Sequence, residues 1–144
     1  MTATIKLEGS EELQRALRRA SDEVKEAASK AVMGTAFDLE ADVKDSLRQP
    51  GRGVTYSLTN PKRTHTASAP GDPPATDTGR LVSSIYREAL GNLTAAVGSR
   101  IVYANHLEYG TMKMAARPFF RPAVEKIKPK YIRRLERALG DALK

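Results

Sequence analysis

The tripeptide Asp77-Thr78-Gly79 is the stretch whose residue types most directly suggest chemistry, because aspartic proteases carry the same three residues at their catalytic centre. In those enzymes the aspartate ends an apolar strand and shares a proton with a second aspartate. Here the tripeptide follows Pro73-Pro74-Ala75-Thr76, which is not an apolar strand. Three residues are a weak motif, whereas Asp and Thr are preferred caps of helix N-termini. We therefore predict that Asp77 and Thr78 cap a short helix rather than catalyse hydrolysis.

The remaining reactive side chains form no catalytic or metal-binding set. The two histidines, His65 and His106, have no Cys, Asp or Glu three or four residues further on that would suggest a metal site. The chain has no cysteine, no nucleophile turn around a serine and no Gly-Lys-Ser/Thr phosphate loop. We predict a protein that is not an enzyme and that uses no cofactor, metal or small-molecule substrate.

The basic charge of the chain is concentrated near its end. The formal net charge is +7, and residues 121–144 hold eight basic and three acidic side chains, a net +5. Six of the basic residues are Lys126, Lys128, Lys130, Arg133, Arg134 and Arg137. A helix with these residues can bind the phosphates of DNA, be a solvated face, or meet an acidic protein surface. We favour the last two, and we expect any DNA contact to be independent of base sequence.

Hydrophobic periodicity predicts a short strand and then a long N-terminal helix. Apolar and polar residues alternate from Thr2 to Glu8, which is typical of a half-buried strand. From Glu11 to Ser46 two apolar stripes recur at helical spacing and are offset near Gly34, where a bend is expected. Ser10 is a suitable cap for this helix. The second stripe is Val32, Ala36, Leu39, Val43 and Leu47. Such a helix would be about 50 Å long, so we expect part of it to contact a neighbouring subunit.

Residues 49–78 differ in composition from both of their flanks. The segment is rich in Pro, Gly, Ser and Thr and has few large apolar side chains, so it buries too little surface to offset its ordering entropy. One weak strand is predicted from Val54 to Leu58. We expect residues 49–78 to form a mobile arm that becomes ordered on contact with another molecule.

The second half of the chain is predicted to contain short elements and a final helix. A helical turn is expected at Arg80–Ser84, a hairpin of strands at Ile85–Leu90 and Leu93–Gly98, and a second helical turn at Tyr103–Tyr109, ended by Gly110. The last helix begins near Pro118 or Pro122, and Pro129 is expected to kink or split it.

These elements predict a single α+β domain over residues 1–144. A long N-terminal helix and a C-terminal helix pack on a small, mostly antiparallel β-sheet, and a long Pro/Gly-rich loop joins them. No apolar stretch reaches the length of a membrane span, and the first residues do not form a signal-peptide pattern.

Two sets of short motifs follow one another between residues 69 and 123. The first is Ala69-Pro70-Gly71-Asp72-Pro73-Pro74-Ala75, Asp77-Thr78-Gly79-Arg80-Leu81 and Ser84-Ile85. The second is Val97-Gly98, Tyr103-Ala104, Leu107-Glu108-Tyr109-Gly110-Thr111 and Ala116-Arg117-Pro118-Phe119-Phe120-Arg121-Pro122-Ala123. In this order the motifs resemble those of the neck or tail-component proteins of long-tailed bacteriophages, which include head–tail joining and minor tail proteins.

The resemblance implies a structural virion subunit without catalytic activity. It implies assembly of an α+β protein into a ring or collar at the head–tail junction or tail end, in the host cytoplasm and then in the virion. The implied partners are other copies of the chain and neck or tail proteins such as the tail terminator and connector proteins. The alternative is a basic nucleic-acid-binding protein that uses the last helix and the loop.

Ten residues are the candidates for contacts between subunits or with these partners. They are Pro70, Gly71, Pro73, Tyr103, Leu107, Tyr109, Arg117, Phe119, Phe120 and Arg121. Arg117 and Arg121 are expected to bind carbonyl or carboxylate oxygens of a neighbour. One of the two phenylalanines is expected in the core and the other as an interface anchor. We also expect the Pro-rich arm to meet residues 117–123, within one subunit or across a ring.

Overall fold

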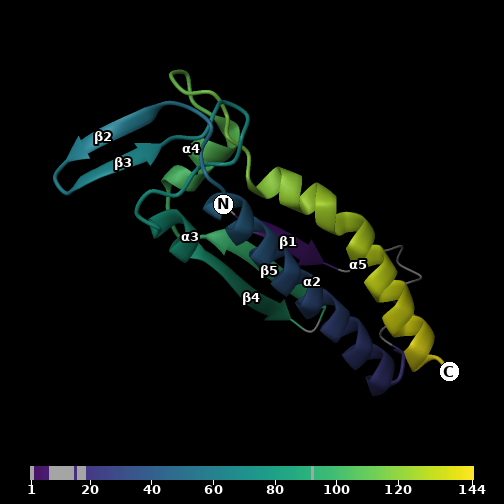
Figure 1. Ribbon diagram of the computed structural model, residues 1–144. Coiled ribbons are helices and arrows are strands. Elements are labelled where there is room, and N and C mark those ends of the chain that lie inside the picture. The colour runs from purple at the N-terminus through teal and green to yellow at the C-terminus, as the bar shows by residue number, and fades with distance from the viewer. Residues whose placement is uncertain (1, 7–14, 16–18, 92) are drawn as a thin grey trace.

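The computed structural model describes residues 2–6, 15, 19–91 and 93–144, and it shows an α+β fold (Figure 1). Its elements, in chain order, are β1 (Thr2–Lys6), α2 (Asp22–Arg48), β2 (Thr55–Thr59), β3 (Lys62–Thr66), α3 (Arg80–Ser84), β4 (Ile85–Gly91), β5 (Thr94–Ser99), α4 (Tyr103–Tyr109) and α5 (Phe120–Ala142). The predicted fold class is therefore confirmed, with the N-terminal and C-terminal helices packed on small antiparallel sheets.

The main sheet has three antiparallel strands in the order β1-β5-β4. Strand β5 is central, so Val97 pairs with Ala3 on one side and with Arg87 on the other. Figure 1 shows α2 lying across one face of this sheet and α5 running antiparallel along α2. The molecule is consequently elongated, with the chain's C-terminus at one end and the β2–β3 hairpin at the other.

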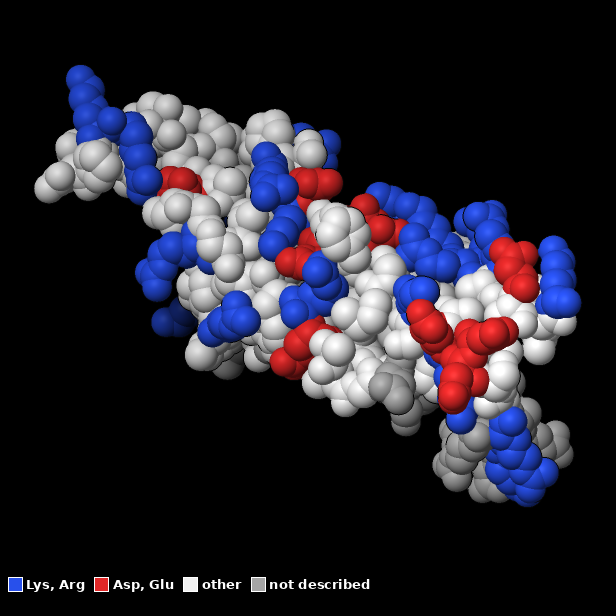
Figure 2. Space-filling model, turned by 90° about the horizontal axis from the view of Figure 1, so that it is seen from below, with Lys and Arg blue, Asp and Glu red and all other residues white. Residues whose placement is uncertain are grey.

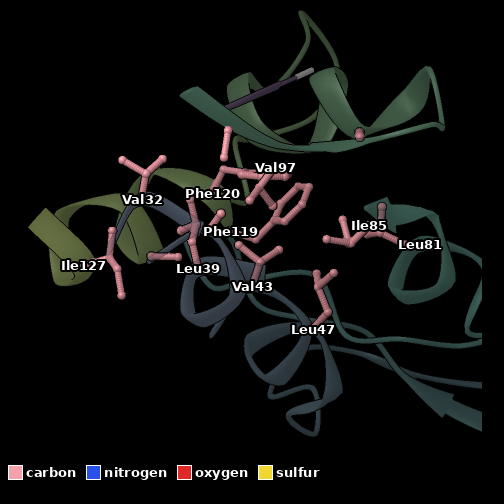
Figure 3. Close-up of a cluster of buried hydrophobic side chains, with 14 residues drawn as sticks. Val32, Leu39, Val43, Leu47, Leu81, Ile85, Val97, Phe119, Phe120 and Ile127 are labelled. Carbon is pink, nitrogen blue, oxygen red and sulfur yellow. The ribbon is translucent and has the colours of Figure 1, made fainter. Parts of the chain in front are cut away.

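The core lies between α2, the sheet and the start of α5. All five residues of the predicted second stripe are buried, so the helical periodicity identified the inner face of α2 correctly. The core cluster comprises Val32, Ala36, Leu39, Val43, Leu47, Leu81, Ile85, Ala95, Val97, Ala104, Phe119, Phe120, Ala123 and Ile127. Figure 3 shows the two phenylalanines among side chains of α2 and β5.

The N-terminal helix is shorter than predicted. Ala20 and Ser21 are not helical, and α2 begins at Asp22, with the Ser21 hydroxyl accepting a hydrogen bond from the Val24 backbone N–H at 3.4 Å. One continuous helix from Glu11 to Ser46 is therefore wrong, and the predicted cap at Ser10 lies outside the described residues. Gly34 does not interrupt α2. A Cβ there would lie 3.2 Å from Nη1 of Arg134 in α5, so the glycine makes room for that side chain.

Residues 49–78 contain a β-hairpin, of which only the first strand was predicted. Strand β2 lies one residue beyond the predicted Val54–Leu58, and its partner β3 was not predicted. The two strands pair only with each other, and most of their side chains are exposed. Figure 1 shows the hairpin projecting from the body of the molecule. The predicted mobility of the segment stays a prediction.

The remaining short elements occur where they were expected. Helix α3, the β4–β5 hairpin and α4 match their predicted positions to within one residue, and Gly110 follows α4 as its C-cap. Helix α5 continues through Pro129, so the prediction of a split is wrong. The N-cap of α3 is Gly79, with φ 79° and no side-chain hydrogen bond. The prediction that Asp77 and Thr78 cap this helix is therefore wrong. None of the described helices is long and apolar enough to cross a membrane.

Candidate assembly surface

The Pro-rich arm and the segment before α5 meet inside one subunit, as expected. The Gly71 backbone N–H donates to the Ala116 carbonyl at 3.0 Å, and Arg117 Nη1 donates to the hydroxyl of buried Ser68 at 2.8 Å. The Arg117 backbone N–H also donates to the Leu107 carbonyl of α4 at 2.6 Å. We call this region, where residues 67–79, α4 and residues 110–119 meet, the junction.

Glu108 is the buried charged residue around which the junction is built. Its Oε2 accepts the backbone N–H groups of Phe119 and Phe120 at 2.8 and 3.0 Å, and its Oε1 accepts that of Arg121 at 2.8 Å. These donors begin α5, which has no side-chain cap of its own because its N-cap residue is a phenylalanine. A carboxylate there also opposes the positive end of the helix dipole. Glu108 therefore fixes the start of α5 to the end of α4.

The turn after α4 requires a glycine. Gly110 has φ 76° and ψ 177°, a combination that residues with a Cβ essentially never adopt. A Cβ at this position would also lie 2.8 Å from the Ala116 nitrogen and 2.9 Å from the Met114 carbonyl oxygen. The chain can therefore fold back tightly beneath Glu108 only because residue 110 lacks a side chain.

Asp77 takes part in an ion-pair network and has no catalytic arrangement. Its Oδ2 accepts a hydrogen bond from Arg63 Nη2 at 2.9 Å, and its Oδ1 lies 3.8 Å from His65 Nδ1. Both belong to β3, so the contacts attach the hairpin to the junction. Asp77 lines a pocket of about 320 Å³ that has no second carboxylate in its wall, so the proton-sharing pair of an aspartic protease is missing. The described residues contain no cluster of three potential metal ligands.

The ten candidate contact residues fall into three groups by exposure. Pro70, Gly71, Tyr103, Tyr109 and Arg121 are exposed, Pro73, Leu107 and Arg117 are partly buried, and Phe119 and Phe120 are buried. Both phenylalanines are core residues. Their backbone N–H groups both donate to Glu108, and these bonds hold the first turn of α5 against the body of the subunit. The expected division between a core ring and an interface ring is therefore wrong. Arg117 is engaged by Ser68, whereas the Arg121 guanidinium has no partner among the described residues.

Apolar side chains are exposed around α4. Val102, Tyr103, Tyr109 and Met112 all present large apolar surfaces to solvent, and the Met112 side chain is fully exposed. We call these four residues the apolar end. The 320 Å³ pocket connects it to the hairpin, because Tyr103 and Leu107 of α4 and His65 of β3 share its wall. Large apolar side chains exposed within one short stretch of chain are candidates for an interaction surface.

Sequence reasoning missed Glu108, Val102 and Met112. A usable signal for Glu108 was the lack of Ser, Thr, Asp or Asn immediately before α5, which implies a cap from elsewhere in the chain. Val102 and Met112 carried no comparable signal, because exposure depends on how the chain folds around α4.

Comparison with known proteins identifies a family. Residues 11–110 match the family model described as "Bacteriophage HK97-gp10, putative tail-component". The match covers 100 of the 144 residues and includes α2, the hairpin, β4, β5 and α4, whereas α5 lies beyond it. Neither the curated proteins nor the solved structures contain a significant match.

Proposed function

Because the chain belongs to the HK97 gp10-like family of bacteriophage tail components, we propose that it is a structural subunit that forms a ring at the head–tail junction or tail end. The family is one of structural virion proteins, so partners among other phage structural proteins follow from membership. We propose three further points: that the subunits form a ring, that the ring lies at the head–tail junction or tail end, and that its neighbours are the tail terminator and connector proteins.

The apolar end is the observation that supports this proposal most directly. Tyr109 and Met112 are both exposed, and neither packs against the core of its own subunit. Tyr and Met are enriched in protein interfaces, where their burial contributes strongly to affinity. A subunit that exposes them at one end is suited to bury them against a neighbour.

The β2–β3 hairpin supplies a second contact in this proposal. A two-stranded hairpin that has no core beneath it is marginally stable in water, so a neighbour that covers it would stabilise its ordered form. Exposed Val54 and Tyr56 provide apolar area for such a contact. We propose that the hairpin part of residues 49–78, which makes few contacts with the body, is mobile in the free subunit and becomes ordered in the ring.

Complementation of a phage that lacks the gene tests the proposal. Replacing Tyr109 and Met112 together by Ser should lower the titre of infectious particles at least about tenfold, because interface anchors of this kind each contribute about 2 kcal/mol or more. Electron microscopy should show heads and tails that have not joined, or tails without a finished end.

The matched control replaces Ile132 and Leu143 by Ser, since both are also exposed apolar residues but lie in α5 and directly after it, remote from the apolar end. Both double variants should unfold at urea concentrations close to that of the wild type. A wild-type titre for the Tyr109/Met112 variant, or an equal loss for the control, contradicts the proposal. Light scattering should show masses that are multiples of 15.7 kDa when the ring forms.

A further inference from the structure

The cations of α5 fall into a paired and an unpaired group. Arg134 Nη2 lies 2.6 Å from Asp38, and Lys126 Nζ lies 3.2 Å from Asp42, so these two residues hold α5 against α2. Lys128 and Lys144 pair with acids three residues away on their own helix or its end. Arg121, Lys130, Arg133 and Arg137 have no anionic partner among the described residues, and all four are exposed.

Three of the four unpaired cations form a straight row. Spacings of three and four residues place Lys130, Arg133 and Arg137 on one side of an α-helix, and the row is about 10 Å long. Lys126, four residues before Lys130, continues the row by one turn. We call Lys130, Arg133 and Arg137 the basic row. Figure 2 shows Lys and Arg atoms along the upper edge of the half of the molecule opposite the hairpin, with acidic side chains gathered below them.

The composition of the basic row favours a polyanion over a folded protein as its partner. Ile132 is a large exposed apolar side chain beside the row, whereas protein interfaces are anchored by groups of aromatic and aliphatic side chains and are depleted of lysine. Evenly spaced cations on a rigid helix suit the regularly spaced phosphates of duplex DNA. Side chains that bind only phosphates provide affinity without base specificity.

We infer that the basic row binds the phosphate backbone of double-stranded DNA without sequence preference. The row lies on α5, outside the residues that match the family, and remote from the apolar end. The inference therefore goes beyond the proposed assembly role and stands independently of it.

Fluorescence anisotropy with 30-base-pair duplexes of two unrelated sequences tests this inference. The full chain should bind both with similar affinity, and log Kd should depend linearly on log salt. The variant Lys130→Gln/Arg133→Gln/Arg137→Gln should lose three phosphate contacts. The slope should then fall by about 2.7, at about 0.9 for each contact, and the affinity at 100 mM salt should fall about tenfold or more.

A control of equal charge separates the row from the net charge. Lys62→Gln/Arg80→Gln/Lys113→Gln also removes three exposed cations without ion-pair partners among the described residues, and it should keep most of the affinity and the slope. Far-UV circular dichroism should show both variants folded.

Four outcomes overturn the inference: no binding by the wild-type chain, equal losses in the two variants, a strong preference for one sequence, or tighter binding to an acidic polypeptide of matched charge. The last outcome would assign an acidic protein surface instead. Particle assembly by the row variant is measured in a separate experiment. A failure of DNA binding therefore does not contradict the proposed ring, and a failure of the ring does not contradict DNA binding.

Discussion

At the residue scale, Glu108 explains how two helices of different direction are joined without a conventional cap. A buried carboxylate costs free energy unless its oxygens are hydrogen-bonded, and here both oxygens accept backbone N–H groups. The same bonds satisfy donors that the start of α5 would otherwise leave unpaired. The backbone N–H groups therefore offset the cost of burying the carboxylate, and the carboxylate offsets the cost of burying the N–H groups.

Glu108→Gln should lower the free energy of unfolding by about 2 kcal/mol, because an amide is neutral and directs an NH2 group towards backbone donors. Urea denaturation followed by circular dichroism measures this loss. Glu88→Gln, which changes an exposed carboxylate with no partner among the described residues, should alter stability by less than about 0.5 kcal/mol. Equal stability of the two variants would show that the Glu108 charge does not stabilise the junction.

At the element scale, the two hairpins differ in what surrounds them. In the β4–β5 hairpin, residues 95–99 of β5 are buried, because β5 lies between two strands and beneath α2. In the β2–β3 hairpin, by contrast, all of β2 except Leu58 is exposed. The first hairpin is part of the core, whereas the second is attached to the body at its base and through the contacts of Arg63 and His65 with Asp77.

Replacing residues 55–66 by Asn-Gly should remove the projecting hairpin and leave the fold intact. The Ala67 N–H already donates to the Val54 carbonyl at 2.9 Å, which is the closing bond of a two-residue turn, and Asn-Gly favours that turn. The free energy of unfolding should change by less than about 1 kcal/mol, because the hairpin buries little surface and its ion pair is partly exposed. Phage titre in the complementation assay should fall sharply.

The matched control is Pro61→Gly, which changes the turn between the two strands from Asn-Pro to Asn-Gly and keeps both strands. It should support a near-normal titre. A loss of more than about 3 kcal/mol in the shortened variant would mean that the hairpin is part of the folding unit, and a normal titre would remove it from the assembly contacts.

At the scale of the whole molecule, one core unites the long helices with the β4–β5 hairpin and the short helices between them. Residues from α2, α3, both strands of the β4–β5 hairpin, α4 and α5 contact one another in a single cluster. No second cluster exists among the described residues that could fold separately. One domain over residues 1–144 stays a prediction, which unfolding experiments can test.

Urea unfolding should accordingly be a single transition. The five tyrosines lie in β2, β4, α4 and α5, so their fluorescence reports on regions distant in sequence, while far-UV circular dichroism reports mainly on α2 and α5. The two signals should have the same midpoint, as expected for a two-state domain of this size. Midpoints that differ reproducibly would indicate separate folding units and contradict a single domain.

Periodicity explains which parts of this fold could be predicted. The inner face of α2 was predicted because Val32, Leu39 and Val43 repeat at helical spacing, and the β4–β5 hairpin because Gly91 separates two strand-like runs. The boundary at Ser21 was missed, because the apolar spacing continues across it and Ser10 offered an equally good cap. Local patterns thus located the elements better than their ends.

The missed features depend on contacts between distant segments. Strand β3 has the sequence Lys-Arg-Thr-His-Thr, which lacks apolar alternation, so only its pairing with β2 makes it a strand. Asp77 contacts Arg63 instead of capping α3, because the hairpin returns to the junction. The burial of both Phe119 and Phe120 follows from Glu108, which is eleven and twelve residues away. No local pattern contains that information.

The Glu108 contacts also determine how mechanical load would travel through the subunit. Tyr109 is the next residue along the chain, so a pull on the apolar end acts within one residue of the carboxylate. Three hydrogen bonds then connect that point directly to the start of α5. Force applied to the apolar end would therefore reach α5 through the Glu108 side chain as well as through the intervening backbone.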